Sequence, residues 1–371
     1  MPRTLVVSDL HLGMRAGSDV LRHAEVLDEF LAALDGVDRL VLLGDTLEFR
    51  QGSVREVLER ATPVLRRLGD CLGSRPVVLV PGNHDHVLAA AWLADRGRPL
   101  GLEARCPPAQ ASSTAAAVAE LLAPASVELA YPGLWLGDGI YAMHGHYLDV
   151  HMTVPTLERL VIAGSSRLTL ARDRRWDDVH SPDDYEAVVA PVYAWAHAAA
   201  QSGRPSTAVA GGGTVRGWNA LRPSAPRALQ ARTLQTLFRL TVRTLNAAGL
   251  GPLSSELSTT ELRRSGLRAM SEVVERLRVQ ARHVIFGHTH RAGMMPDDAP
   301  AEWLTPNGAR LHNTGSWALS QTFSHGPHSP YWPGSAVLVE DGAPPRLLRL
   351  LARHDAAVLT GERSARVTAP S

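Results

Sequence analysis

Short apolar runs alternate with longer, helix-like segments in the first part of the chain. Three runs have the length and the Val and Leu content of buried strands: residues 4–7, 39–43 and 77–80. Residues 20–34 and 53–69 between them carry apolar side chains at helical spacing, and Ser53 with Glu56 forms a capping-box pattern. This β-α-β-α-β order predicts an α/β fold built in layers.

The pattern becomes less regular after residue 86. Residues 86–126 are expected to form short helical pieces, and residues 139–143 another strand. Later strands are expected at residues 283–286, 311–317, 335–340 and 346–351, the last three as a meander that closes a second sheet.

A mostly helical stretch separates the two groups of strands. Ser181-Pro182-Asp183-Asp184 is a strong helix start, and residues 156–172 and 228–247 have apolar faces. We predict an insertion that acts as a lid or cap, although an ordinary helical layer without a substrate role would give the same pattern. The predicted organisation is a core of residues 1–150 and 256–355, a helical insertion of residues 151–255 and a loose tail of residues 356–371.

Polar side chains follow the predicted strands where each strand ends. They are Asp9, His11, Asp45, Asn83, His84, His144, His288 and His290. In α/β sheets, functional residues collect beyond the carboxyl ends of the strands, so we expect these side chains to lie close together. A lone strand-end His is usually a loop residue, and a lone Asp is usually a helix N-cap. These explanations would have to hold independently at five strand ends, which favours a shared site.

The residue types in this set predict a metal centre. Carboxylate oxygen and imidazole nitrogen suit Zn, Mn, Fe or Ni, and the absence of a thiolate argues against a structural cysteine-zinc site. The number of ligands allows two metals that clamp a phosphoryl group. The expected sets are Asp9, His11 and His290 for one metal, Asn83, His144 and His288 for the other, and Asp45 as the bridge.

Five motifs together resemble those of the calcineurin-like metallophosphoesterases. They are Asp9-Leu-His11, Gly44-Asp45, Gly82-Asn83-His84-Asp85, His144 and Gly287-His288-Thr-His290. The resemblance implies a four-layer α-β-β-α sandwich with two divalent metal ions, of which Mn is favoured and Fe, Zn or Ni are alternatives. It also implies hydrolysis of a phosphoester by metal-bound hydroxide.

The resemblance also assigns roles within the third motif. His84 is expected to contact the phosphate and to protonate the leaving group, with Asp85 as the residue that orients it. Asn83 is expected to serve both as a metal ligand and in substrate binding. His146 lies two residues after His144 on the same side of the strand. It is expected to be a hydrogen-bond partner of the ligands or a substrate contact, with an ordinary loop His as the alternative.

The opening Asp9-Leu10-His11-Leu12 and the helical insertion are similar to the UDP-2,3-diacylglucosamine pyrophosphohydrolase branch of the family. The chain differs from that branch at His84, where the branch usually carries Arg, and at His146, which replaces an Asp. We therefore predict a phosphodiesterase or pyrophosphatase that acts on a small-molecule or lipid-linked phosphoester.

Composition bears on the two alternative functions, a nuclease and a non-catalytic scaffold, and on the cellular location. A formal net charge of +1 and the absence of a basic stripe argue against a nuclease of the same fold and against nucleic acid as a partner. The complete ligand set argues against a non-catalytic scaffold. Two cysteines form no disulfide framework, and neither a signal peptide nor a membrane span is evident, so a cytoplasmic location is expected.

Overall fold

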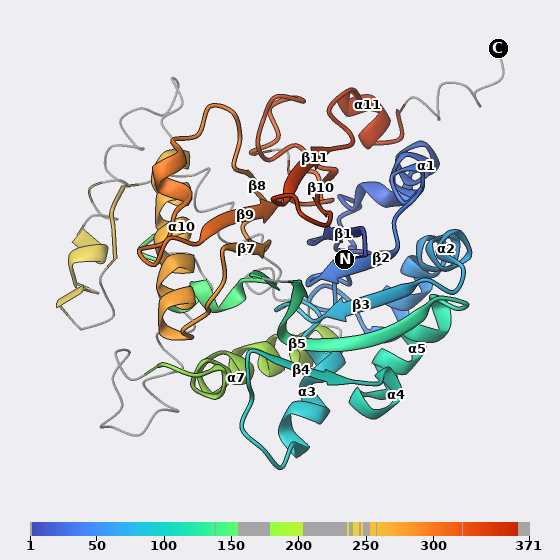
Figure 1. Ribbon diagram of the computed structural model, residues 1–371, viewed down its shortest axis with the longest axis horizontal. Coiled ribbons are helices and arrows are strands. Elements are labelled where there is room, and N and C mark those ends of the chain that lie inside the picture. Colours follow the sequence, from blue (N-terminus) through green and yellow to red (C-terminus); the bar gives the residue numbers. More distant parts are fainter. Residues whose placement is uncertain are drawn as a thin grey trace.

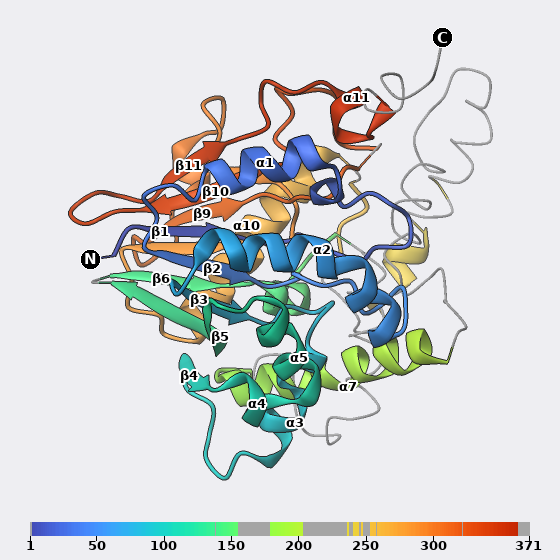
Figure 2. The same ribbon diagram turned by 90° about the vertical axis from the view of Figure 1, so that its right-hand side faces the viewer.

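Strands β1, β2 and β3 lie side by side and parallel, as the hydrophobic pattern predicted. Their bounds are Thr4–Val7, Arg39–Leu43 and Pro76–Val80. Helices α1 (Ala24–Ala32) and α2 (Val54–Leu72) connect them and cover one face of the sheet, and Figure 2 looks onto this helical layer.

The computed structural model describes residues 2–154, 179–202 and 253–362 except 138, 257 and 321, together with residues 236, 240–244, 246 and 247.

Strand β5 (Ser126–Gly137) joins two halves of one large sheet. Its first half pairs parallel with β3, and its second half pairs antiparallel with β6 (Ile140–Met143). The strand order is β11-β10-β1-β2-β3-β5-β6-β7-β9-β8, with β4 paired to β5 at the side. The sequence pattern missed both β4 (Glu103–Cys106) and β5, which the prediction treated as helical pieces and connecting chain.

Side-chain alternation shows that the two halves of the sheet pack face to face. Leu5 and Val7 of β1 belong to the core beneath α1 and α2, whereas Val6 points to the opposite side. There Val6 shares a second core with Ala142 of β6 and Ile285 of β7. A third core lies on the outer face of the second half, beneath α7 and α10. Three cores between four layers confirm the predicted α-β-β-α sandwich, with α10 and α2 on opposite sides of the strands in Figure 1.

The second helical layer begins at the predicted signals. The Ser181 side chain accepts a hydrogen bond from the Asp184 amide at the start of α7 (Pro182–Gln201), and Ser258 caps α10 (Thr259–Arg276) in the same way. Because α7 packs on the core, this part of the expected insertion forms an outer layer. The other helical segments expected there, residues 156–172 and most of 228–247, lie outside the described residues.

Two expectations for the C-terminal part were wrong. Strand β9 (Arg310–Thr314) pairs with β7, but β10 (Ser335–Val339) pairs with β1, and β11 (Arg346–Arg349) pairs with β10. The expected meander is therefore divided between the two halves of the sheet. The stretch expected to be a loose tail begins with a packed helix, α11 (Ala356–Leu359), of which Val358 and Leu359 are buried.

The remaining described elements are short. They are η1 (Val20–Arg22), α3 (Val87–Asp95), α4 (Pro108–Ala111), α5 (Ser113–Leu121), η2 (His146–Val150), β7 (His283–Phe286), β8 (Ala292–Gly293) and η5 (Pro300–Trp303). Among the described helices, none has the length and apolar content required to cross a bilayer.

Replacing Gly133 by Ala should destabilise the fold, because Gly133 lies where β5 passes from one half of the sheet to the other. A Cβ there would lie 2.3 Å from the Ala142 carbonyl oxygen and 2.6 Å from the Tyr141 hydroxyl. We expect a loss of about 1–3 kcal/mol, measured as a lower midpoint of thermal unfolding. Gly101→Ala is the control, since the nearest atom to its Cβ is 4.0 Å away. Equal midpoints for the two variants would contradict the prediction.

Candidate metal centre

The polar residues that follow the strands converge at one edge of the sandwich. Asp9 and His11 follow β1, Asp45 follows β2, Asn83 and His84 follow β3, His144 follows β6, and His288 and His290 follow β7. Their ligand atoms form three overlapping groups, each within 4.8 Å: Asp9, His11 and His290; His11, Asp45 and His84; and Asp45, His144 and His288. Asn83 joins these seven residues through its Oδ1, which lies 3.2 Å from His144 Nε2 and 3.1 Å from His288 Nδ1, so all eight strand-end residues lie together.

Backbone strain marks the same residues. Six described non-glycine residues have a positive φ, a conformation that side chains with a Cβ seldom adopt. Five of the six are candidate ligands: Asp9, His11, Asp45, His288 and His290, with φ between 47° and 65°. Strain of this kind persists only where the surroundings impose it, and it gathers at functional sites.

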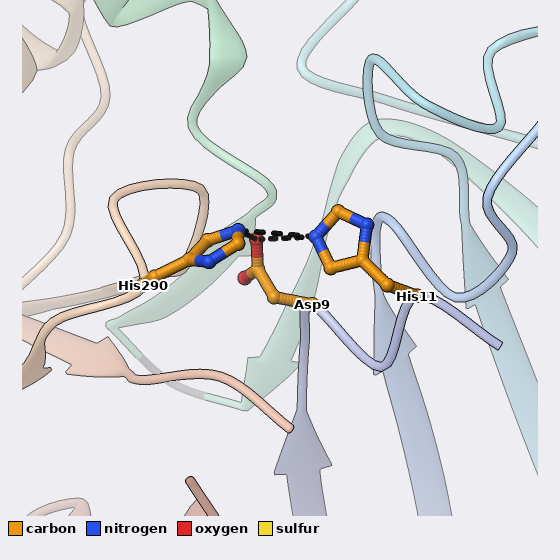
Figure 3. Close-up of side chains that lie close together, drawn as sticks. All are labelled: Asp9, His11 and His290. Carbon is orange, nitrogen blue, oxygen red and sulfur yellow. Dashed lines mark hydrogen bonds and ion pairs between the residues drawn. The ribbon is translucent and has the colours of Figure 1, made fainter. Parts of the chain in front are cut away.

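The first group is built around Asp9 (Figure 3). The Nε2 atom of His290 lies 3.2 Å from Asp9 Oδ1 and 3.0 Å from His11 Nε2. Burial alone would raise the pKa of Asp9, but the neighbouring imidazole of His290 lowers it to about 2. Burial alone would lower the pKa of His11, but the carboxylate of Glu48 raises it to about 9. The group therefore needs positive charge between its nitrogen and oxygen atoms, as protons or as a cation.

The second group combines Asp45, Asn83, His144 and His288. Asp45 Oδ2 lies 3.3 Å from His144 Nε2, and Asn83 Oδ1 lies 3.2 Å from His144 Nε2 and 3.1 Å from His288 Nδ1. Such a set of acceptors is stable around a cation. Without one, hydrogen bonding favours the reversed amide, whose NH2 group would donate to these atoms while its oxygen accepted from the guanidinium of Arg50 at 3.2 Å.

Asp45 lies between the two groups. Its Oδ2 atom is 3.9 Å from the Nε2 atoms of both His11 and His84, in addition to its contact with His144. Oxygen and nitrogen donors without sulfur suit the harder divalent transition metals. The residues present therefore fit two cations with a carboxylate between them.

Glu48 is a buried carboxylate that the sequence interpretation missed. It contacts His84 Nδ1 at 2.8 Å and His11 Nδ1 at 3.0 Å, so it orients two imidazoles at once. Its pKa is held well below its usual range because both imidazoles outweigh the effect of burial. Its position three residues after Asp45 was the available signal. The expectation that Asp85 orients His84 was wrong, because Glu48 occupies that position.

Asp85 instead holds the backbone of the site. Its carboxylate accepts hydrogen bonds from the amides of Gly82, Asp45, Thr46 and Leu47 at 2.7–3.3 Å. These bonds fasten the loop after β2 to the turn after β3. The approach is so close that a Cβ on Gly82 would lie 2.3 Å from Asp45 Oδ1. Asp85 therefore positions Asp45 and does not contact the imidazole of His84.

His146 lies behind the site and does not face substrate. It is fully buried, its Nε2 is 3.1 Å from the Tyr131 hydroxyl, and its ring packs beside His144 at 5.6 Å between centroids. Burial and the neighbouring His144 hold its pKa well below the usual value. Its hydrogen bond is to Tyr131, so the structure supports neither the expected substrate contact nor the expected hydrogen bond to a candidate ligand.

Two further polar residues border the candidate ligands. Asp149 Oδ1 lies 3.0 Å from His288 Nε2, on the side of the ring opposite to Asn83. Arg50 is almost fully buried, and its Nε donates to the Asn83 carbonyl at 3.1 Å. A carboxylate that contacts the outer nitrogen of a ligand imidazole fixes the tautomer of the ring. The periodicity of the chain gave no signal for either residue, because Arg50 lies in a turn and Asp149 in the short helix η2.

Two cavities meet at this centre. A cleft of about 800 Å³ is lined by residues of both groups and extends along α10, and a second cavity of about 720 Å³ lies between α3 and α7. Asn83 and His84 line both of them. Arg50 lines the second cavity, so a buried positive charge lies next to the shared wall.

Comparison with known proteins agrees with this geometry. The family model of calcineurin-like phosphoesterases matches residues 2–292. No match was found among the curated proteins.

Replacing Glu48 by Gln should lower the affinity for Mn²⁺ by about 10–100-fold, because the neutral amide no longer orients His11 and His84 as a charged acceptor. Calorimetric titration of metal-stripped protein would measure the change. Glu59→Gln, on the exposed surface of α2, is the matched control. An unchanged affinity for Glu48→Gln would show that its contacts do not support the metal centre.

Proposed function

The chain belongs to the calcineurin-like phosphoesterase family, and we propose that it is a metal-dependent phosphohydrolase that cleaves a phosphodiester or a pyrophosphate. The observation that carries the proposal is the convergence of three overlapping Asp and His groups, five of whose seven residues line one cleft. The family as a whole supports hydrolysis of a phosphoester. The UDP-2,3-diacylglucosamine branch stays a prediction, since the family match does not single it out.

The proposed ligand sets follow the two groups. Asp9, His11 and His290 would hold one cation, Asn83, His144 and His288 would hold the other, and Asp45 would contact both. Divalent ions in such a pair polarise phosphoryl oxygens and lower the pKa of a coordinated water. Mn²⁺ is the favoured ion, with Fe, Zn and Ni as alternatives. The neutral side chain of Asn83 leaves the site with net positive charge, which suits an anionic ester.

His84 is the proposed proton donor to the leaving group. Its Nδ1 is held by Glu48, so its Nε2 is the nitrogen left on the Asp45 side, where the candidate metal ligands gather. Burial lowers the pKa of His84, and Glu48 opposes this effect. An imidazole whose Nδ1 is held by a carboxylate is oriented for proton transfer at its Nε2, which suits general acid catalysis. Arg50, next to Asn83 and His84, adds a fixed positive charge for the phosphoryl group.

The two cavities favour a substrate with two substituents on phosphorus. A phosphomonoester carries a single organic group, whereas a diester or pyrophosphate has one on each side of the scissile phosphorus. The cavities lie on the two sides of the wall formed by Asn83 and His84. A phosphorus atom bound at that wall could place one substituent in each.

Hydrolysis of bis-p-nitrophenyl phosphate and p-nitrophenyl phosphate with added Mn²⁺ tests the proposal. We expect faster turnover of the diester, loss of turnover with a chelator and recovery when Mn²⁺ returns. Absence of turnover of both esters with Mn, Fe, Zn and Ni would overturn the proposed function.

His84→Ala should lower kcat by about 10²–10⁴ on diphenyl phosphate, because phenol is a poor leaving group that needs a proton. The loss should be smaller on bis-p-nitrophenyl phosphate, whose leaving group is more acidic. His180→Ala, at an exposed position, is the matched control. Equal losses on both diesters, with metal content unchanged, would assign His84 a role other than proton donation.

A further inference from the structure

A glycine in the middle of α10 lies against the candidate metal centre. Glycine is a weak helix former, so a glycine inside a helix usually has a reason in packing or function. At Gly266, close contact with a neighbouring residue does not explain the glycine. A Cβ would meet only Thr289 Cγ2, at 3.6 Å, which is an ordinary van der Waals distance.

The position of Gly266 shows what a side chain there would occupy. Thr289 lies between His288 and His290, and all of these residues line the cleft of about 800 Å³. A side chain on Gly266 would therefore extend into the cleft beside the candidate ligands. The missing side chain leaves that space open.

Several apolar residues line the same cleft as Gly266. We call the part of the cleft that they form the apolar arm, and the residues that define it are Met152, Leu262, Gly266, Leu267, Trp303 and Phe323. Met152, Leu267 and Trp303 belong to the core beneath α10, and Leu262 and Phe323 pack against that core. The arm is thus an open edge of a continuous hydrophobic core.

The charges along the arm are already paired. Arg263 and Arg291 also line the cleft, but both contact the carboxylate of Asp298, at 2.9 Å and 2.6 Å. Arg263 contacts Glu302 as well, at 2.6 Å. Because these guanidiniums are neutralised within the protein, the arm suits an uncharged group better than a second phosphate.

We propose that the apolar arm binds an apolar alkyl or aryl substituent of the phosphoester, and that Gly266 keeps the space for it. This inference rests on the proposed function, since the metal centre would hold the phosphoryl end of the same ligand. It assigns a substrate class, a phosphoester with one apolar substituent, and it makes Gly266 a residue that determines specificity.

The test compares the binding of octylphosphonate and methylphosphonate to the Mn²⁺-loaded protein by calorimetry, which does not require turnover. A fully buried methylene contributes about fourfold in affinity. We expect octylphosphonate to bind at least about tenfold more tightly than methylphosphonate to the wild type. In Gly266→Leu, whose side chain fills the arm, the ratio of affinities should fall to about one.

Two variants control this comparison. Gly266→Ala adds a single methyl group and should keep most of the ratio. Arg268→Leu adds the same side chain at an exposed position of α10 and should keep all of it. Far-UV circular dichroism verifies that each variant is folded.

An octyl-to-methyl ratio near one in the wild type would overturn the proposal, including the case in which the chain itself fills the arm. A ratio that is unchanged in Gly266→Leu would overturn the assignment of the arm. Diester hydrolysis together with phosphonate affinities that do not depend on chain length would contradict the role of the apolar arm and leave the proposed function standing. Phosphonate affinities that depend on chain length, without hydrolysis of any ester, would contradict the proposed function and leave the apolar arm standing.

Discussion

The site depends on one buried carboxylate that is not itself a candidate metal ligand. Asp85 accepts four backbone amide hydrogen bonds from two loops, and the His84 amide donates to Asp45 Oδ1 across the same junction at 2.8 Å. Hydrogen bonds from amides to a charged acceptor are stronger than those between neutral groups. They hold Asp45 in its strained conformation, with φ near 50°, between the two groups of imidazoles. The spacing of the whole centre follows from that arrangement.

Charge balance is the second constraint on the centre. Asp9, Asp45 and Glu48 are essentially buried, and an unpaired buried carboxylate costs several kcal/mol. The carboxylates raise the pKa of His11 and of His144 to about 9, against the effect of burial. An imidazole nitrogen binds a metal ion only when it carries no proton. Acid therefore competes with the metal for this site.

Sequence reasoning located the candidate ligands because parallel strands end at a common edge, and the structure places these residues, far apart in the chain, close together at that edge. Sequence reasoning failed where the partner of a residue is not its neighbour in the sequence. Asp85 is adjacent to His84, yet the partner of His84 is Glu48. Strand β5 was missed because Pro132 and Gly133 interrupt it, and because its residues face three different cores in turn. Alternation along such a strand does not give the simple period that predicts a half-buried strand.

The junction of the two half-sheets at β5 has a consequence for the local unfolding of the protein. Asp9, His11, Asp45 and Asn83 come from the β1–β3 half of the sheet, whereas His144, His288 and His290 come from the β6–β7 half. Each proposed cation would thus be held from both halves. Local unfolding of either half would remove ligands from both ions, so metal release and loss of amide-exchange protection should occur together as one cooperative event. The bound ions would therefore link the two halves of the sheet, so that both halves unfold together.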